Sequence, residues 1–193
     1  MPGRGAMSTP AVPWPADWLV PDWPAPPWVR AVCTTRSGGV SGMPWDSLNL
    51  GDHVGDNPAA VQANRDHLAA CLQAAPVFLQ QVHGTAVACL GDAEEVAPRM
   101  ADACVARGPG IACTVMVADC LPVLLVDTEG RAVAAAHAGW RGLAGAGGHG
   151  VIEAVLGALG AGAAKSTMAW LGPCIGPRAF EVGDDVRQAF VAT

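Results

Sequence analysis

The chain has 193 residues, of which 51% are hydrophobic and 15% are charged, and its formal net charge is −6. This length can supply the core of one compact domain, and the negative balance argues against binding to a nucleic-acid backbone. No apolar run is both long and free of Gly, Pro and charge, and the first residues lack a signal-peptide pattern, so we expect a cytoplasmic protein without a membrane partner. The seven cysteines follow no repeating spacing, which favours free thiols.

The chain divides by composition into an N-terminal arm, residues 1–27, and one domain, residues 28–193. The arm is rich in Pro and Trp, so we expect an extended segment, either partly disordered or docked through its tryptophans, that carries no chemistry. Residues 29–35 alternate in polarity and predict a strand. A glycine-rich turn follows, and then a loop over residues 47–58.

The next elements have clearer signals. Asn57 is a plausible helix N-cap with Pro58 at the first helical position, and an apolar stripe continues to Leu72. Residues 77–90 predict two strands or one bent strand, with His83 at the bend.

The second half of the chain predicts buried strands and a further helix. Two apolar runs, joined by a turn at residues 128–130, place Cys120 and His137 at strand ends. A helix over residues 151–159 and a strand and turn over 168–177 complete a mixed α/β pattern. We see no internal repeat and no dinucleotide-binding glycine motif.

Three residues that can bind a metal lie in short motifs. These are His83 in QVHG, Cys120 in ADCLP and His137 in AHAGWRG. One thiolate and two imidazoles suit tetrahedral zinc with a fourth position open, as in catalytic sites. Such a site would acidify a bound water and suit deamination, although no His is followed two residues later by the Glu of the familiar zinc deaminases.

Seven motifs in order, TTRSGGVS, SLNLGDHVGD, NRDHL, QVHG, ADC with a following Pro, AHAGWRG and GPCIGPRAFEVGDDV, resemble the YfiH family. This family carries the label of multicopper polyphenol oxidase or laccase domain and is regarded as zinc-dependent purine nucleoside phosphorylases. The resemblance implies an α/β fold, a layered α/β/β/α sandwich with mixed sheets. It also implies zinc held by His83, Cys120 and His137. The family's C-terminal FSYRR-like segment is not found, so we expect a chain that lacks the end of the domain.

The resemblance also implies the chemistry. The expected substrates are phosphate and the purine nucleosides adenosine, inosine, guanosine and S-methyl-5′-thioadenosine, with adenosine deamination as a further activity. A bacterial branch of the family is linked to keeping wrong amino acids out of peptidoglycan precursors. His149 lies in a stretch that departs from the family pattern and is not expected to be a ligand.

Phosphorolysis needs groups for phosphate and for the nucleoside. Arg36 and Arg141 lie beside glycines and could bind phosphate bidentately, and we favour Arg36. Asn49 and Gln81 could hydrogen-bond a base or ribose. We therefore predict catalytic roles for Arg36 and Asn49 beside the three metal ligands. Asp119 should point away from Cys120 on a strand and serve a structural or supporting role.

Other candidates have plainer interpretations. Cys174 could be a nucleophile, but its neighbours include no evident base, which favours a buried thiol. His53 and His67 are expected to be structural or surface residues. Trp140 could stack on a purine or pack in the core.

Two functions compete with the phosphorylase. One is an editing factor that binds or hydrolyses a wrongly built nucleotide-sugar amino acid in cell-wall synthesis. The other is a copper-dependent polyphenol oxidase, because two His and one Cys also suit blue copper. Copper is the less favoured metal, since the chain has five His and no His-X-His pair for further copper atoms.

Overall fold

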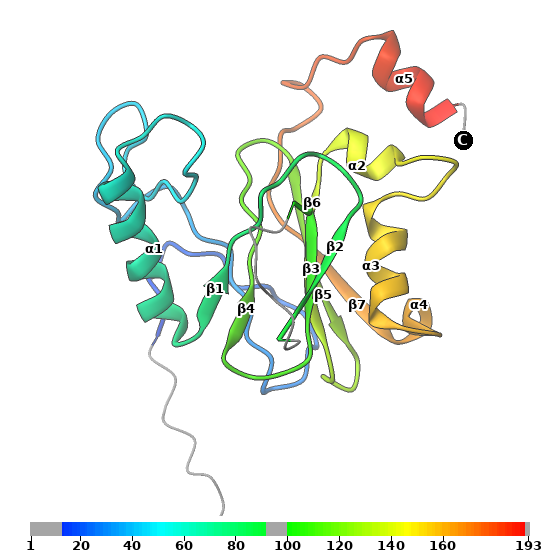
Figure 1. Ribbon diagram of the computed structural model, residues 1–193, viewed down its shortest axis with the longest axis horizontal. Helices are drawn as coiled ribbons and strands as arrows, with labels where there is room; N and C mark the ends of the chain where they lie inside the picture. The colour runs from blue at the N-terminus through cyan, green and yellow to red at the C-terminus, as the bar shows by residue number, and fades with distance from the viewer. Residues whose placement is uncertain (1–12, 92–99, 192–193) are drawn as a thin grey trace, which may run out of the picture.

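The computed structural model describes residues 13–91 and 100–191. Its elements form four layers, which Figure 1 shows from the helix α1 on one side to α3 on the other. The order along the chain is α1 (Pro58–Leu72), β1 (Ala75–Val77), β2 (Val87–Leu90), β3 (Ala103–Ala106), β4 (Ile111–Cys113), β5 (Leu121–Asp127), β6 (Val133–Ala138), α2 (Trp140–Ala144), α3 (Val151–Leu159), α4 (Ala163–Ser166), β7 (Thr167–Leu171) and α5 (Asp184–Val191).

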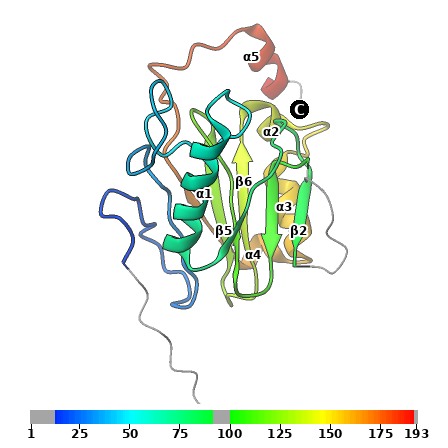
Figure 2. The same ribbon diagram turned by 60° about the vertical axis from the view of Figure 1, so that its left-hand side comes forward.

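The two sheets between these helices are unequal. The strands β1 and β4 form a parallel pair. The larger sheet has the order β2-β3-β6-β5-β7, in which β2 and β3 run parallel and the remaining pairs run antiparallel. The expected mixed α/β sandwich is therefore confirmed, with α1 and the small sheet on one side of the large sheet (Figure 1). Figure 2 shows α1 in front of the large sheet and α3 behind it.

Each face of the large sheet has its own core. On one face, alternate residues of β3, β5 and β6 pack against Val151 and Val155 of α3. On the other face, Cys104 and Ala135 pack with Ile111 and Cys113 of β4. Because successive strand residues point to opposite faces, His137 lies on the same face as Ala135, between the two sheets.

The first helix begins as its sequence predicts. Asn57 has an extended backbone and its side chain accepts a hydrogen bond from the N–H of Ala59 at 2.9 Å, while Pro58 occupies the first turn. Val61 and Leu68 form the buried face. Asn64 is buried with them, although amides are usually exposed.

The described part of the N-terminal arm, from residue 13, is docked. Trp18 is 5% exposed and packs with Leu48 and Leu68. The indole Nε1 of Trp14 donates to the carbonyl of Cys71 at 3.2 Å. Of the two expected forms, a partly disordered or a docked arm, residues 13–27 adopt the docked one; residues 1–12 lie outside the described part.

The strand expected over residues 29–35 is wrong. Only Cys33 forms a bridge there, with Leu19 of the arm. The prolines of the arm lack an N–H group, so they cannot extend this bridge into a ladder. Within the described residues, no helix is long and apolar enough to span a bilayer.

Candidate metal centre

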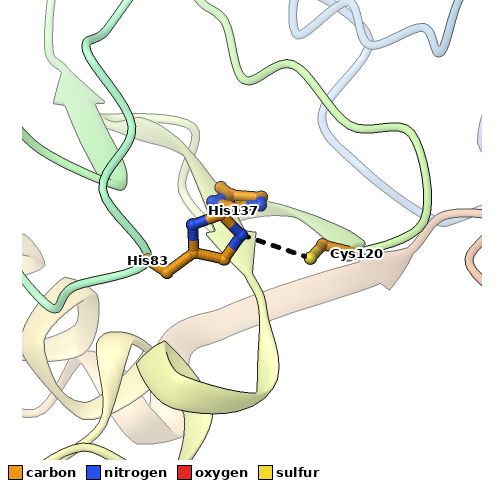
Figure 3. A group of neighbouring side chains, drawn as sticks. All are labelled: His83, Cys120 and His137. Carbon is orange, nitrogen blue, oxygen red and sulfur yellow. Dashed lines mark hydrogen bonds between the residues drawn. The ribbon is translucent and has the colours of Figure 1, made fainter. Parts of the chain in front are cut away.

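The three expected metal ligands meet at one end of the large sheet. His83 lies in the loop before β2, Cys120 directly precedes β5, and His137 is the second-last residue of β6. Their ligand atoms all lie within 4.8 Å of one another, and Figure 3 shows the three side chains converging.

The donor set fits zinc. The Sγ of Cys120 is 3.8 Å from the Nε2 of His83. Tetrahedral zinc, with bonds of 2.0–2.1 Å to nitrogen and 2.3 Å to sulfur, places these atoms about 3.6 Å apart. The imidazoles of His83 and His137 meet edge to face with ring centroids 4.7 Å apart. Three protein ligands leave a fourth position for a water or a substrate atom.

A buried carboxylate holds both histidines. Asp102, which precedes β3, has no exposed surface. Its Oδ1 is 2.8 Å from the Nδ1 of His137 and accepts the backbone N–H of His83 at 2.8 Å. Its Oδ2 accepts the backbone N–H groups of Val82 and Gly84 at 3.1 and 2.7 Å. Because an ionised carboxylate can only accept, the proton of neutral His137 is on Nδ1 and Nε2 is free for a metal.

The same hydrogen bonds account for the backbone of His83. This residue has φ of +60°, a conformation that L-residues seldom adopt. Three consecutive N–H groups, from Val82 to Gly84, converge on Asp102. They fix the bend and direct the imidazole of His83 towards Cys120.

Gly139 is required for the close approach of the ligands. A Cβ at this position would lie 2.8 Å from the Cδ2 of His83 and 3.2 Å from the Sγ of Cys120. The backbone of Gly139 has φ of −66°, which any residue can adopt. The glycine of AHAGWRG is therefore needed for space and not for its conformational freedom.

Charge and burial act on the titratable groups of the site. Burial raises the pKa of Asp102, but the hydrogen bonds from His137 and from three backbone N–H groups outweigh it and hold that pKa below its usual range. The pKa of the Cys120 thiol is raised, first by burial and then by electrostatic interaction with Asp119, Asp102 and Cys174. A bound cation would reverse this balance and favour the thiolate.

The three candidate ligands line a cavity of about 1490 Å³ between the two sheets. Arg36, Asn49 and Gln81, for which we predict roles in substrate binding, line the same cavity. The guanidinium of Arg36 is largely exposed and contacts Asp46, with Nε 2.9 Å from the carbonyl and Nη2 3.3 Å from Oδ1.

The two cavity amides already have protein partners. The side chain of Gln81 exchanges two hydrogen bonds with the backbone of Met116, at 2.7 and 2.8 Å. The Nδ2 of Asn49 donates to the carbonyl of Gly51 and to Asp56, and its Oδ1 accepts the N–H of Gly51. The contact of either amide with a nucleoside stays a prediction.

The other candidates lie elsewhere or differ from expectation. Arg141 does not line this cavity; its guanidinium lies 4.3 Å from the ring centre of Trp140. Its role as a phosphate ligand stays a prediction. Cys174 is exposed and lines the cavity, so the expectation of a buried thiol is wrong. The reason is that Cys174 follows β7 in an irregular segment that no described helix or strand covers. His53, His67 and His149 are exposed, and Asp119 is an exposed cavity residue.

Two residues of this site were not anticipated. Asp102 follows Ala101 at the start of an apolar run, and an Asp before a buried strand is the one signal that could have identified it. Gly139 lies within a quoted motif, but its closeness to two ligands depends on the packing of separate strands.

Comparisons with known proteins give matches over most of the chain. Residues 30–193 match the profile of a family described as multi-copper polyphenol oxidoreductase laccase. The chain is 56% identical over 175 residues to a purine nucleoside phosphorylase of Pseudomonas aeruginosa, covering 91% of this chain and 69% of the relative. It is 52% identical over 176 residues to the purine nucleoside phosphorylase YfiH of Escherichia coli, covering 90% and 70%.

A solved structure shows the same fold. The crystal structure of a protein from Neisseria meningitidis is 47% identical to the chain and superposes with a TM-score of 0.83. The match covers 91% of this chain and 70% of that protein.

Proposed function

The chain belongs to the multi-copper polyphenol oxidoreductase laccase family, and we propose that it is a zinc-dependent purine nucleoside phosphorylase of the bacterial cytoplasm. The proposed substrates are phosphate and adenosine, inosine, guanosine or S-methyl-5′-thioadenosine. The observation that carries the proposal is the His83, Cys120 and His137 trio on the wall of a cavity that Arg36 also lines. The printed names of the bacterial relatives supply the reaction type.

The reaction transfers ribose from the purine to phosphate. An oxygen of phosphate bonds to C1′ of the ribose, the bond from C1′ to the purine nitrogen breaks, and the electron pair leaves with the purine, which takes up a proton. The enzyme must therefore hold an anion near C1′ and stabilise the departing base.

Arg36 suits the anion. A guanidinium has five N–H donors in a planar fork, and the contacts with Asp46 engage only Nε and Nη2. The side chain of Arg36 is 72% exposed and lines the cavity, so its remaining donors are accessible to an anion. Asp46 fixes the guanidinium and leaves one edge for phosphate.

Asp102 orients the two histidines for metal binding. The Oδ1 of Asp102 accepts from the Nδ1 of His137, which turns Nε2 towards the other ligands, and the same carboxylate fixes the bend that carries His83. A bound zinc would supply Lewis acidity, polarising an electronegative substrate atom. His137 is 4% exposed whereas His83 is exposed, so substrate would approach from the side of His83.

Zinc fits better than the copper set of an oxidase. A multicopper oxidase needs further histidines, and the chain has five in all. Among the described residues, the only group of three or more possible metal ligands within bonding range is this trio.

The proposal is tested by incubating zinc-loaded protein with adenosine, with and without phosphate, and separating the products by chromatography. We expect adenine and ribose 1-phosphate only with phosphate, and neither from Cys120→Ala. Inosine formed without phosphate would reveal the deaminase activity that the family resemblance implies. Cys174→Ala is the matched control, since it removes a cavity thiol outside the trio and should retain turnover. Folded, zinc-loaded protein that forms no phosphate-dependent product would refute the phosphorylase.

A further inference from the structure

The segment that carries both Arg36 and Asn49 is an irregular loop over residues 36–57, which Figure 1 shows beside α1. Apart from the isolated turns within it, this loop has no helix or strand to fix its path. Nevertheless both side chains must keep a constant position relative to the metal ligands if they are to act together. Some other group must order the loop.

Asn64 is that group. It lies on α1 and is 1% exposed. Its Oδ1 accepts the backbone N–H of Val40 at 2.9 Å. Its Nδ2 lies 2.9 Å from the hydroxyl of Ser41, 3.1 Å from the carbonyl of Ser47 and 2.8 Å from the carbonyl of Asn49. All four partners belong to the loop, so one buried amide joins residues 40–41, 47 and 49 to the helix.

These contacts lead directly to the two cavity residues. The carbonyl of Asn49, which Asn64 contacts, belongs to the proposed substrate residue itself. The backbone N–H groups of Ser47 and Leu48 both donate to the carbonyl of Arg36 at 2.8 Å. Fixing Ser47 therefore also fixes the backbone from which the guanidinium of Arg36 extends.

A second layer of hydrogen bonds closes the network. The hydroxyl of Ser41 donates to the Oδ2 of Asp56 at 2.6 Å, and the same oxygen accepts from the Nδ2 of Asn49 at 2.9 Å. Gly39 leaves room for this amide, because a Cβ at position 39 would lie 2.5 Å from the Oδ1 of Asn64. The amide of Asn64 is packed so closely that the loop has little freedom to adopt another path around it.

Asn64 does not line the cavity, and it lies apart from the hydrogen bonds that hold the metal ligands. We propose that Asn64 is a positioning residue that holds the loop so that Arg36 and Asn49 face the metal centre, independently of metal binding. The inference rests on the proposed function in assigning phosphate to Arg36. Under this proposal two buried residues position two parts of the site. Asp102 positions the metal ligands, and Asn64 positions the residues that contact phosphate and nucleoside.

The test replaces the donor amide by a carboxyl of the same shape, Asn64→Asp. This change sets an oxygen against the carbonyls of Ser47 and Asn49 and removes the donated hydrogen bonds. Gln62→Glu is the matched control, because it makes the same chemical change on the exposed face of the same helix. All variants are loaded with zinc before measurement.

Hydrogen exchange of peptides from residues 36–57 is the first measurement. We expect exchange about tenfold faster in Asn64→Asp than in the parent, and unchanged exchange in Gln62→Glu. Zinc affinity, measured by chelator competition, should stay within about twofold of the parent, since the metal supports are separate. Unchanged exchange in the loop, or a loss of zinc binding equal to that of Cys120→Ala, would overturn the proposal.

Steady-state kinetics is the second measurement. We expect the KM for phosphate to rise about tenfold or more in Asn64→Asp, because small displacements of positioned groups are costly. In the double variant with Arg36→Ala the rise should be smaller than the sum of the two effects, since both act through one guanidinium. A loop that exchanges faster with an unchanged KM would show a purely structural role and refute positioning. Absence of phosphorolysis in the parent would instead refute the proposed function, and the exchange measurement would still decide whether Asn64 orders the loop.

Discussion

The substitution Asp102→Asn tests the support of the metal centre. The carboxylate of Asp102 faces four N–H groups, three from the backbone and one from His137. The asparagine side chain has one oxygen and one NH2 group, so it cannot accept from all four. If its oxygen faces His137, its NH2 opposes the N–H groups of Val82 and Gly84. If its NH2 faces His137 instead, the imidazole must move its proton to Nε2 and lose its metal lone pair.

Either arrangement of the asparagine should lower the affinity for zinc, and the size of the loss can be predicted. Removing a carboxylate that orients a metal-binding histidine lowers metal affinity about 10- to 100-fold, which corresponds to about 1.4–2.7 kcal/mol. Part of the loss should come from the bend at His83, whose φ of +60° depends on the same carboxylate. We expect Asp102→Asn to fall within this range, and Cys120→Ala, which removes a ligand, to fall beyond it.

Competition between the protein and a chromophoric zinc chelator measures the affinity directly. Asp119→Asn is the control, because Asp119 also places a negative charge near Cys120 but is exposed and outside these hydrogen bonds. If Asp102→Asn bound zinc as tightly as the parent, the positioning role would be wrong. If Asp119→Asn lost as much affinity as Asp102→Asn, the effect would be one of net charge and not of geometry.

Three further predictions concern space, pH and the arm. Gly139→Ala should lower zinc affinity about tenfold or more with little change in melting temperature, because its methyl group would meet His83 and Cys120 while its backbone remains allowed; unchanged affinity in the same chelator assay would contradict this. Since hydrogen bonding holds the pKa of Asp102 below the unfolded value of about 3.9, its ionised form stabilises the metal-free protein above about pH 4, and that stability is lost as the pH falls through the folded pKa. Urea unfolding between about pH 5 and pH 2 should therefore show that the free energy of unfolding falls less steeply with decreasing pH in Asp102→Asn than in the parent. Parallel curves for the two proteins would contradict this prediction. Trp18→Ala should reduce the free energy of unfolding by about 3–5 kcal/mol, because the indole is 5% exposed between Leu48 and Leu68; a loss below about 1 kcal/mol would indicate an arm that is not docked in solution.

Local patterns were sufficient for the elements that depend on neighbours in the chain. The helix cap at Asn57 and Pro58 needs only residues within one turn, and it formed as expected. The ends of β5 and β6 follow from apolar runs, which is why Cys120 and His137 were placed correctly. The strand expected over residues 29–35 failed because a strand needs a partner, and the proline-rich arm can pair with it at one position only.

The choice of His83, Cys120 and His137 as candidate metal ligands also came from the sequence, because three residues with metal-binding side chains lie in ordered motifs, and the structure brings them together. The residues that position these ligands and the cavity loop could not be identified from the sequence. Asp102 and Asn64 are polar residues whose role arises from burial, and burial depends on which distant segments pack over them. The same holds for Cys174, which lies at the cavity, and for Arg141, which lies over Trp140. Sequence fixes which groups can bind a metal or an anion, whereas tertiary packing decides which of them share a cavity and which hydrogen bonds orient them.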